Sequence, residues 1–326
     1  MILAGDIGGT NTRLALFTAD GARIVRDEVL PSRAHRTFGS ALRAFLGKKR
    51  PRLSGASFGI AGPVAFGRVK TTNLPWTVDE RALARTLGLR KVTLLNDLVA
   101  LALGAIAAPR KDLHLVQGRR PPGLIHGTVA VLAAGTGLGE AALVWDGARF
   151  VPCGTEGGHV DFAPRTALES ELRDFIGKRV GGRVSYERVL SGPGLGMLYD
   201  FFRTGRGVFE DPEDTSAIAA APDRNAAIAT LGASRKSAAC TAALELFASL
   251  YGAEAGNLAL KTLSVGGVFL AGKIAASNLP VLERLFLPSF LDKGRMSPLL
   301  ARMPVAVVKS SSIGLYGAAR HAAGLT

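Results

Sequence analysis

Cysteine is scarce in this chain of 326 residues, which has only Cys153 and Cys240. The two lie far apart and match no metal-ligand spacing, so the sequence supports neither a disulfide framework nor a zinc site. The segment MILAGDIGG also lacks a basic region, a long apolar stretch and a small-residue cleavage site, so no secretory signal is expected. A cytoplasmic protein fits these absences best.

Long uninterrupted apolar runs are also lacking. The longest candidate, VTLLNDLVALALGAIAAP at 92–109, contains Asn96 and Asp97, so a membrane span is not expected. The presence of Asp97 in this apolar segment needs an explanation, because an ionised carboxylate among apolar neighbours is costly to desolvate. Two interpretations stay open for this segment alone. Asp97 either caps a helix or serves chemistry at the carboxyl end of a strand, where ligands gather in open α/β sheets.

Acidic residues are few relative to basic ones, with 26 Asp and Glu against 40 Lys and Arg. The net charge of +14 and the isoelectric point near 10.4 favour anionic partners such as nucleotides, polyphosphate or nucleic acid. The basic runs at 47–52 and 117–122 contain no interleaved aromatic residues, however. They are therefore interpreted as solvated loops, and no nucleic-acid partner is expected.

Hydrophobic residues make up 48% of the chain and charged residues 20%, which is a globular composition. The length exceeds one comfortable core and predicts two domains with a cleft between them. Residues 2–24 and 128–151 share one pattern, in which a strand, a glycine turn, a second strand and an Asp-Gly turn follow one another. This repeat predicts two related α/β halves.

Other segments alternate between strands and helices. Strands are expected at 54–64, 91–97 and 264–275, and a long buried helix at 237–260. Residues 185–202 suggest two helices separated by a Gly-Pro-Gly break. Residues 210–236 are rich in Asp, Ala and Pro and are expected to form a surface excursion.

The turn Gly135-Thr136-Gly137-Leu138-Gly139 is followed by a strand, so it does not match a dinucleotide-binding fingerprint, which opens a helix. The chain also has no Gly-Lys-Ser/Thr triplet, which excludes a P-loop. What remains is a hairpin whose backbone amides can approach an anion. The turn DIGGTNTR at 6–13 offers similar donors, and Asp6 can orient Mg²⁺ through water. The two turns together predict a nucleoside triphosphate between the domains.

A second polar group occupies GTEGGHVDFAP at 154–164, where Glu156, His159 and Asp161 stand among glycines. Carboxylates with an imidazole suit the vicinal hydroxyls of a sugar, each of which donates and accepts. The spacing from Glu156 to His159 also permits a metal, but the sequence identifies no third ligand.

Seven strings occur in order across residues 3–320: GDIGGTNTRLAL, TNLPW, LLNDL, AAGTGLG, GTEGGHVDFAP, SYERVLSGPGL and GGVFLAGKI. Together they resemble the bacterial ATP-dependent glucokinase family, which has the two-domain actin-like (hexokinase, ribonuclease H-like) ATPase fold. The zinc motif of the related ROK kinases is absent. The resemblance implies an ATP:D-glucose 6-phosphotransferase that uses Mg²⁺, binds ATP and D-glucose, and forms a homodimer.

The resemblance also implies roles for individual residues. Asp97 matches the general base that takes the proton from the C6 hydroxyl. The glucose-binding positions correspond to Asn73, Asn96, Asp97, Glu156, His159 and Glu187. The ATP-binding positions correspond to Asp6, Gly8, Gly9, Thr10, Asn11, Gly135, Thr136, Gly137 and Gly272. Asp6 would hold Mg²⁺ through water.

The expected smaller domain comprises residues 1–107 and 303–326, and the larger domain comprises 108–302. One departure from the family string is Lys273, which stands where a second glycine is usual. Because of Lys273 and the basic composition, polyphosphate stays an alternative phosphoryl donor. Another sugar stays an alternative phosphoryl acceptor. A sugar-sensing regulator is less favoured, because such proteins commonly carry a DNA-binding module before the first strand and only five residues precede Asp6.

Overall fold

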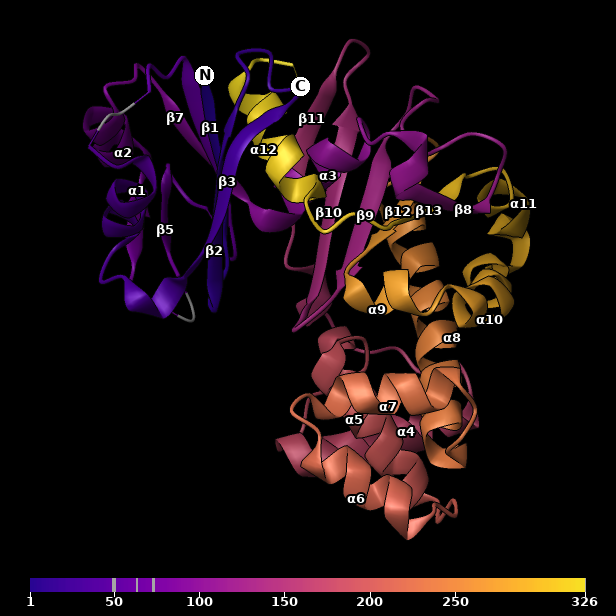
Figure 1. The fold of residues 1–326 in the computed structure, drawn as a ribbon. Coiled ribbons are helices and arrows are strands. Elements are labelled where there is room, and N and C mark those ends of the chain that lie inside the picture. Colours follow the sequence, from indigo (N-terminus) through magenta and orange to yellow (C-terminus); the bar gives the residue numbers. More distant parts are fainter. Residues whose placement is uncertain (49–50, 63, 72–73, 326) are drawn as a thin grey trace. The chain divides into compact units, whose positions relative to one another are not determined.

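The structure, a computed structural model, describes residues 1–48, 51–62, 64–71 and 74–325. The described chain groups into two compact units (Figure 1). The first comprises Met1–Leu113, Ala141–Gly154 and Ser310–Thr326, and the second comprises His114–Glu140 and Thr155–Lys309. The domain boundaries predicted from the sequence are 107/108 and 302/303. They stay a prediction.

The first unit is built on a five-stranded sheet with the order β3-β2-β1-β4-β7. β1 pairs antiparallel with β2 and parallel with β4, and β4 pairs parallel with β7. Apolar side chains fill β1 and β4, as expected for central strands covered on both faces. The strands are β1 (Ile2–Ile7), β2 (Asn11–Phe17), β3 (Ile24–Pro31), β4 (Gly55–Ile60) and β7 (Val92–Asn96).

Helices cover both faces of this sheet, with α1 and α2 on one side and α3 and α12 on the other (Figure 1). α3 and α12 pack with unusual closeness, because a Cβ on Gly317 would lie 1.8 Å from the carbonyl oxygen of Ala100. Only glycine allows the two backbones to approach this far. The elements are α1 (Phe38–Leu46), α2 (Glu80–Leu87), α3 (Asp97–Ala105), α12 (Ile313–Ala322) and a small hairpin of β5 (Arg68–Lys70) and β6 (Thr77–Asp79).

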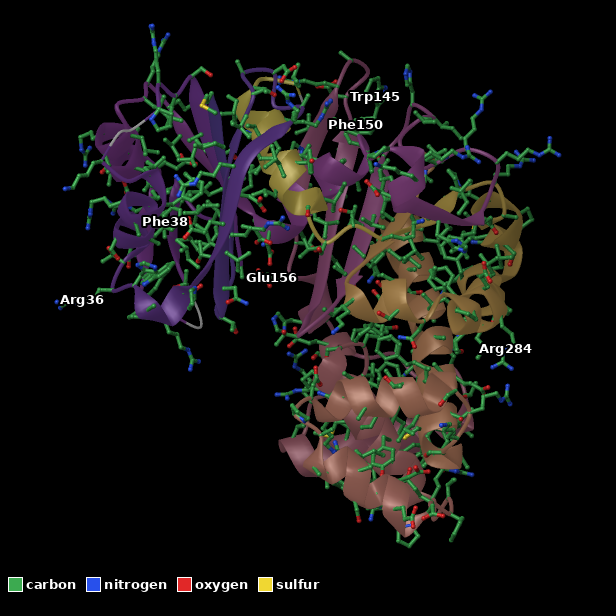
Figure 2. The ribbon with its side chains drawn as sticks, in the orientation of Figure 1. Arg36, Phe38, Trp145, Phe150, Glu156 and Arg284 are labelled. Atoms are coloured by element: carbon green, nitrogen blue, oxygen red, sulfur yellow. The ribbon has the colours of Figure 1, made fainter. Side chains whose placement is uncertain are left out.

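The other large sheet has the order β11-β10-β9-β12-β13-β8. β10 is divided between the units, because Leu138–Glu140 group with the second and its later residues with the first. In the first unit β10 pairs antiparallel with β11, and the rings of Trp145 and Phe150 meet edge to face with centroids 5.0 Å apart (Figure 2). The strands are β8 (Leu113–Gln117), β9 (Val129–Ala134), β10 (Leu138–Trp145), β11 (Phe150–Gly154), β12 (Gly267–Ala271) and β13 (Val305–Val308).

Most of the helices belong to the second unit. The long helix α8 runs through its core, where Tyr251 is fully buried and contacts the rings of Phe247 and Phe286. The expected buried helix at 237–260 is thus confirmed. The helices are α4 (Ala167–Val180), α5 (Gly192–Asp200), α6 (Pro212–Ala220), α7 (Arg224–Ala233), α8 (Ala238–Lys261), α9 (Lys273–Ser277), α10 (Leu279–Leu291) and α11 (Ser297–Leu300).

The repeat read from the sequence is confirmed by the two sheet orders. In each sheet the first strand of the half lies in the middle. On one side of it stand the second and then the third strand, and on the other side stand the two later strands of that sheet. The order β3-β2-β1-β4-β7 thus corresponds to β11-β10-β9-β12-β13. A glycine turn joins the first two strands in both halves.

One local prediction was wrong. In 185–202 the first expected helix is only a short 3-10 turn at Tyr186–Arg188, and Gly-Pro-Gly is the first turn of α5 rather than a break. Ser191 caps this turn and Pro193 stands where its missing N–H costs nothing. The expected surface excursion at 210–236 is confirmed, because most of its residues are at least partly exposed; it contains α6 and α7, which bury Ile218 and Ile228. Within the described residues, no helix is long and apolar enough to cross a membrane.

Candidate active site

The first glycine turn connects β1 to β2. The Gly8 N–H donates to the Asn11 carbonyl at 3.0 Å, and a Cβ on Gly8 would lie 2.9 Å from the same oxygen. Buried Ser32 braces the turn from behind. Its hydroxyl donates to the Gly8 carbonyl at 2.8 Å, and its N–H donates to the Thr10 carbonyl at 2.9 Å. The sequence analysis missed Ser32, because no glycine motif surrounds it.

Asp6 stands at the carboxyl end of β1, opposite Arg13 on β2. Its residue surface is exposed, but the surrounding protein limits hydration of the carboxyl. This partial desolvation and the nearby charge of Asp97 raise the pKa of Asp6 to about 6, while Arg13 acts in the opposite direction. Two carboxyl groups therefore lie near each other in the first unit.

Asp97 is the first residue of α3 and directly follows β7. The cap is Asn96, whose Oδ1 accepts from the Leu98 N–H at 3.0 Å, and the Asp97 Oδ1 accepts from the same N–H at 2.9 Å. The parallel register aligns Ile7 with Ile60, and Ile60 with Asn96. The carboxyl ends of these strands thus bring Asp6 and Asp97 to one edge of the sheet, where the helix N-terminus favours negative charge.

The second glycine turn precedes β10 in the second unit. The Gly135 N–H donates to the Gly137 carbonyl at 2.8 Å, and the Gly135 carbonyl accepts from Gly192 at the start of α5 at 2.7 Å. The Glu187 carboxylate lies against this turn, because it accepts from the Leu138 N–H at 3.1 Å. A Cβ on Gly137 would approach the Glu187 Oε2 to 2.3 Å, so a larger residue there would displace the Glu187 carboxylate.

Gly272 adjoins the same turn. Its φ of 93° favours glycine, and a Cβ would lie 2.3 Å from the carbonyl oxygen of Ala134, the residue before Gly135. The next residue, Lys273, begins α9 and is exposed. The structure therefore brings Gly272 next to the second glycine turn, and both are predicted ATP-binding positions.

The residues Glu156–His159, called the 156–159 loop below, fold into a short 3-10 turn. The side chains of Glu156 and His159 are exposed, with Nε2 of the imidazole 3.9 Å from Oε2 of the carboxylate, and Figure 2 labels Glu156. The loop packs on the start of β10, because a Cβ on Gly158 would lie 2.0 Å from the Leu138 carbonyl oxygen. Its polar side chains therefore face outward from a rigid support.

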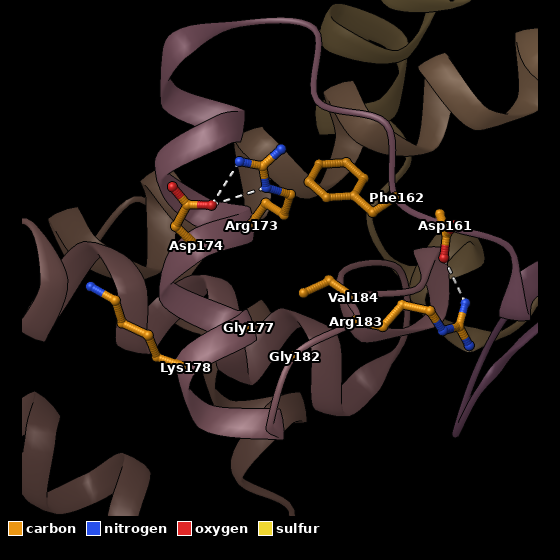
Figure 3. Close-up of a pocket in the computed structure, with 9 residues that line it drawn as sticks. All are labelled: Asp161, Phe162, Arg173, Asp174, Gly177, Lys178, Gly182, Arg183 and Val184. Carbon is orange, nitrogen blue, oxygen red and sulfur yellow. Dashed lines mark hydrogen bonds and ion pairs between the residues drawn. The ribbon is translucent and has the colours of Figure 1, made fainter.

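Arg183 fixes the carboxyl end of this loop. Its Nη1 donates to the His159 carbonyl at 2.8 Å and to Oδ1 of Asp161 at 2.8 Å. Arg183 and Asp161 also line a hollow of about 480 Å³, together with the ion pair of Arg173 and Asp174 (Figure 3). None of the predicted ATP-binding or glucose-binding residues lines it.

The predicted residues thus form one group in each unit. In the first unit they follow one edge of the sheet: Asp6, Gly8, Gly9, Thr10, Asn11, Asn96 and Asp97. In the second unit they surround the second glycine turn: Gly135, Thr136, Gly137, Glu156, His159, Glu187 and Gly272. The predicted sugar contact Asn73 lies outside the described residues.

The chain is similar to known proteins along nearly its whole length. The family model described as Glucokinase matches residues 3–325. The chain is 37% identical to a glucokinase of Nostoc punctiforme, over all of this chain and 99% of that protein. It is 38% identical to a glucokinase of Synechocystis, covering 98% and 97% of the two chains.

Solved structures show the same fold. A crystal structure of a glucokinase from an Antarctic psychrotroph superimposes with a TM-score of 0.82 at 29% identity, covering 99% of this chain and 98% of that one. A glucokinase of Balamuthia mandrillaris in complex with glucose gives a TM-score of 0.80 at 24% identity, covering 98% and 93%. The repeated sheets with their paired glycine turns define a sugar kinase of the actin-like ATPase fold. Within that class, the chain belongs to the glucokinase family.

Proposed function

We propose that this protein transfers the γ-phosphoryl group of ATP to the C6 hydroxyl of D-glucose, with Asp97 as the general base. The observation that carries the proposal is the position of Asp97, at the carboxyl end of β7 beside Asp6. Membership of the glucokinase family supports the same reaction. Phosphoryl transfer passes through a loose transition state, so the protein's main tasks are to position groups and to stabilise charge.

The Asp97 carboxylate accepts the C6 hydroxyl proton as the sugar oxygen bonds to the γ-phosphorus. The bond from that phosphorus to the bridging oxygen breaks, and the bond's electron pair leaves with ADP. The α3 N-terminus and the shared Leu98 N–H favour the ionised form of Asp97 before the proton arrives. Since Asn96 is the cap, the second oxygen of Asp97 is not needed to begin the helix.

The two glycine turns are proposed to bind the phosphates through backbone N–H groups, assisted by Thr10 and Thr136. Two adjacent carboxyls at one sheet edge also fit a divalent cation, and Asp6 would hold Mg²⁺ through water. The described residues contain no group of three or more His, Cys, Asp or Glu side chains able to hold a metal. When bound, the ion neutralises charge on the phosphates.

The glucose hydroxyls are proposed to be bound by the 156–159 loop, by Glu187, by Asn96 and by Asn73. Glu156 and His159 offer an acceptor and a ring that both donates and accepts, which matches hydroxyl groups. Their exposure within a braced loop means that no rearrangement of the second unit is needed to present them.

The test is Asp97→Asn, which keeps the shape and removes the base. We expect kcat to fall by about 10²–10⁴-fold while glucose binding persists in calorimetry. Asp20→Asn, in an exposed turn of the same unit, is the matched control and should leave kcat unchanged. Near-normal turnover of Asp97→Asn would overturn the assignment.

Polyphosphate is the alternative donor, and exposed Lys273 next to Gly272 is the feature that favours it. A cation there adds attraction for a polyanion. Rates with ATP and with polyphosphate, for the wild type and for Lys273→Gly, decide between the donors. No sugar phosphate formed from polyphosphate would exclude this alternative.

A further inference from the structure

Glu140, the third residue of β10, is a buried carboxyl group that the proposed reaction does not use. Its residue is only 2% exposed, and its Oε1 has no hydrogen-bond partner among the described residues. Leaving a buried polar atom unsatisfied is costly. We therefore expect either that the carboxyl group is protonated or that it has a function that offsets this cost.

The Glu140 side chain lies directly beneath the 156–159 loop. A Cβ on Gly157 would lie 2.1 Å from Oε2 and 2.8 Å from Cδ of Glu140. The loop backbone therefore rests on the carboxyl group itself, and no side chain fits between them.

The Thr155 side chain joins the same two segments by hydrogen bonds to their backbones. The Thr155 hydroxyl donates to the Glu140 carbonyl at 2.9 Å and accepts from the Gly157 N–H at 3.1 Å. Gly158 rests on the Leu138 carbonyl in the same manner. Displacement of the Glu140 carboxyl would consequently move the backbone between Glu156 and His159.

The charges near Glu140 are unfavourable for a second anion. Glu254 on α8 is fully buried and holds the available cation, Lys261, at 3.5 Å, together with the Nδ2 group of Asn257 at 2.8 Å. Burial, followed by repulsion from Glu254, raises the pKa of Glu140 to about 7, against the attraction of Lys261. Other titratable or charged groups on the surrounding elements are Tyr251 on α8, Tyr186 and Lys293 near Glu254, Glu187 beside the start of β10, and Glu156, His159 and Arg183 at the loop.

We propose that Glu140 is a positioning residue for glucose, which holds the 156–159 loop in its binding conformation only while its carboxyl group carries a proton. A neutral carboxyl packs beneath the loop backbone without a desolvated charge. Loss of the proton creates an anion beside Glu254, and hydrating that anion requires the loop to lift. The inference rests on the proposed function, because it assigns the 156–159 loop to the sugar.

The experiment measures KM for glucose and KM for ATP from pH 6 to pH 8 in the wild type and in Glu140→Gln, a permanent analogue of the neutral acid. In the wild type we expect KM for glucose to rise by about threefold or more over this interval, since a required proton costs up to tenfold per pH unit above its pKa. Glu140→Gln should keep the low KM at both pH values, and KM for ATP should change equally in both proteins. His159 is present in both proteins, so its effect cancels in the comparison.

A steric test is independent of pH. Gly157→Ala places a methyl group on the Glu140 carboxyl and should raise KM for glucose several-fold, and adding Glu140→Ala should restore part of the loss by vacating that space. An identical pH dependence in wild type and Glu140→Gln, or no rescue in the double variant, would overturn the inference while leaving the kinase intact. Absence of glucose phosphorylation in the wild type would instead refute the proposed function.

Discussion

The protonation of Glu140 has a consequence for stability that can be measured without substrate. The perturbation is again Glu140→Gln, followed through the free energy of unfolding as a function of pH. The pKa is about 7 in the folded protein, against 4.5 for a fully hydrated glutamate, which represents the unfolded chain. The folded state therefore binds one more proton between these values, so its stability falls as the pH rises through this interval.

The magnitude follows from the two pKa values. Raising the pKa from 4.5 to about 7 corresponds to about 3 kcal/mol, because one pKa unit is worth about 1.4 kcal/mol. This stabilisation of the protonated form is complete below pH 4.5 and is lost by pH 8. Glutamine does not titrate, so the variant should gain up to about 3 kcal/mol relative to the wild type between pH 5 and pH 8.

Urea unfolding followed by far-ultraviolet circular dichroism is the suitable assay, because α4 to α11 belong to the second unit. Tryptophan fluorescence is not suitable, since Trp76 and Trp145 both belong to the first unit. Glu169→Gln is the contrasting variant. Glu169 is also 2% exposed but is ion-paired with Arg165 at 2.6 Å, so its replacement should cost about 2 kcal/mol. Parallel stability curves for wild type and Glu140→Gln would refute the reasoning.

Three further predictions concern the supports of the site. Ser32→Ala removes the hydroxyl that fixes Gly8, and we expect KM for ATP to rise about threefold to tenfold in a steady-state assay. Arg183→Ala frees the His159 carbonyl and should raise KM for glucose by a similar factor, with KM for ATP unchanged. Gly317→Ala forces α12 away from α3 and should lower the unfolding midpoint of the first unit, read by tryptophan fluorescence, by several degrees.

Each of these variants has a matched control in the chain. Ser40→Ala removes a half-buried hydroxyl of the α1 capping box in the same unit, away from the glycine turn. Arg173→Ala removes a cation from the hollow of Figure 3 without touching the loop. Gly324→Ala changes a glycine with open space around it. Its φ of 75° is unfavourable for alanine, so a small decrease in the unfolding midpoint is expected from the backbone alone. If a control variant showed the same change as its test variant, the contact assigned to the test residue would not be the cause of that change.

The parts of the fold that repeat were predictable from the sequence. Strand and turn residues alternate visibly in 2–24 and 128–151, because glycine turns and apolar strands depend on local chemistry. The position of Asp97 at a strand end followed from the same local signals, and the structure confirms it. The sequence could not show which of Asn96 and Asp97 is the N-cap of α3, since both are favourable capping residues.

The remaining features depend on contacts between distant segments. Glu140 looks like an ordinary polar residue on a half-exposed strand, and only the packing of Gly157 and Glu254 reveals a buried acid. Ser32 acts on a turn that lies 24 residues earlier in the chain. The surface excursion at 210–236 was predicted without its helices α6 and α7, in which Asp211 and Asp223 are the N-caps and Pro212 is the first residue of α6.

The close packing of α12 on α3 bears on how the protein is made. A ribosome synthesises α3 early, whereas α12 lies at the opposite end of the sequence, behind the whole second unit. The apolar surface of α3 and the sheet face beside it stay uncovered until α12 emerges. The second unit also lacks the core strand β13 until nearly the same point, because β13 ends at Val308 and α12 begins at Ile313. Neither unit is therefore complete until late in synthesis, and chaperone binding is expected at the apolar face that α12 later covers.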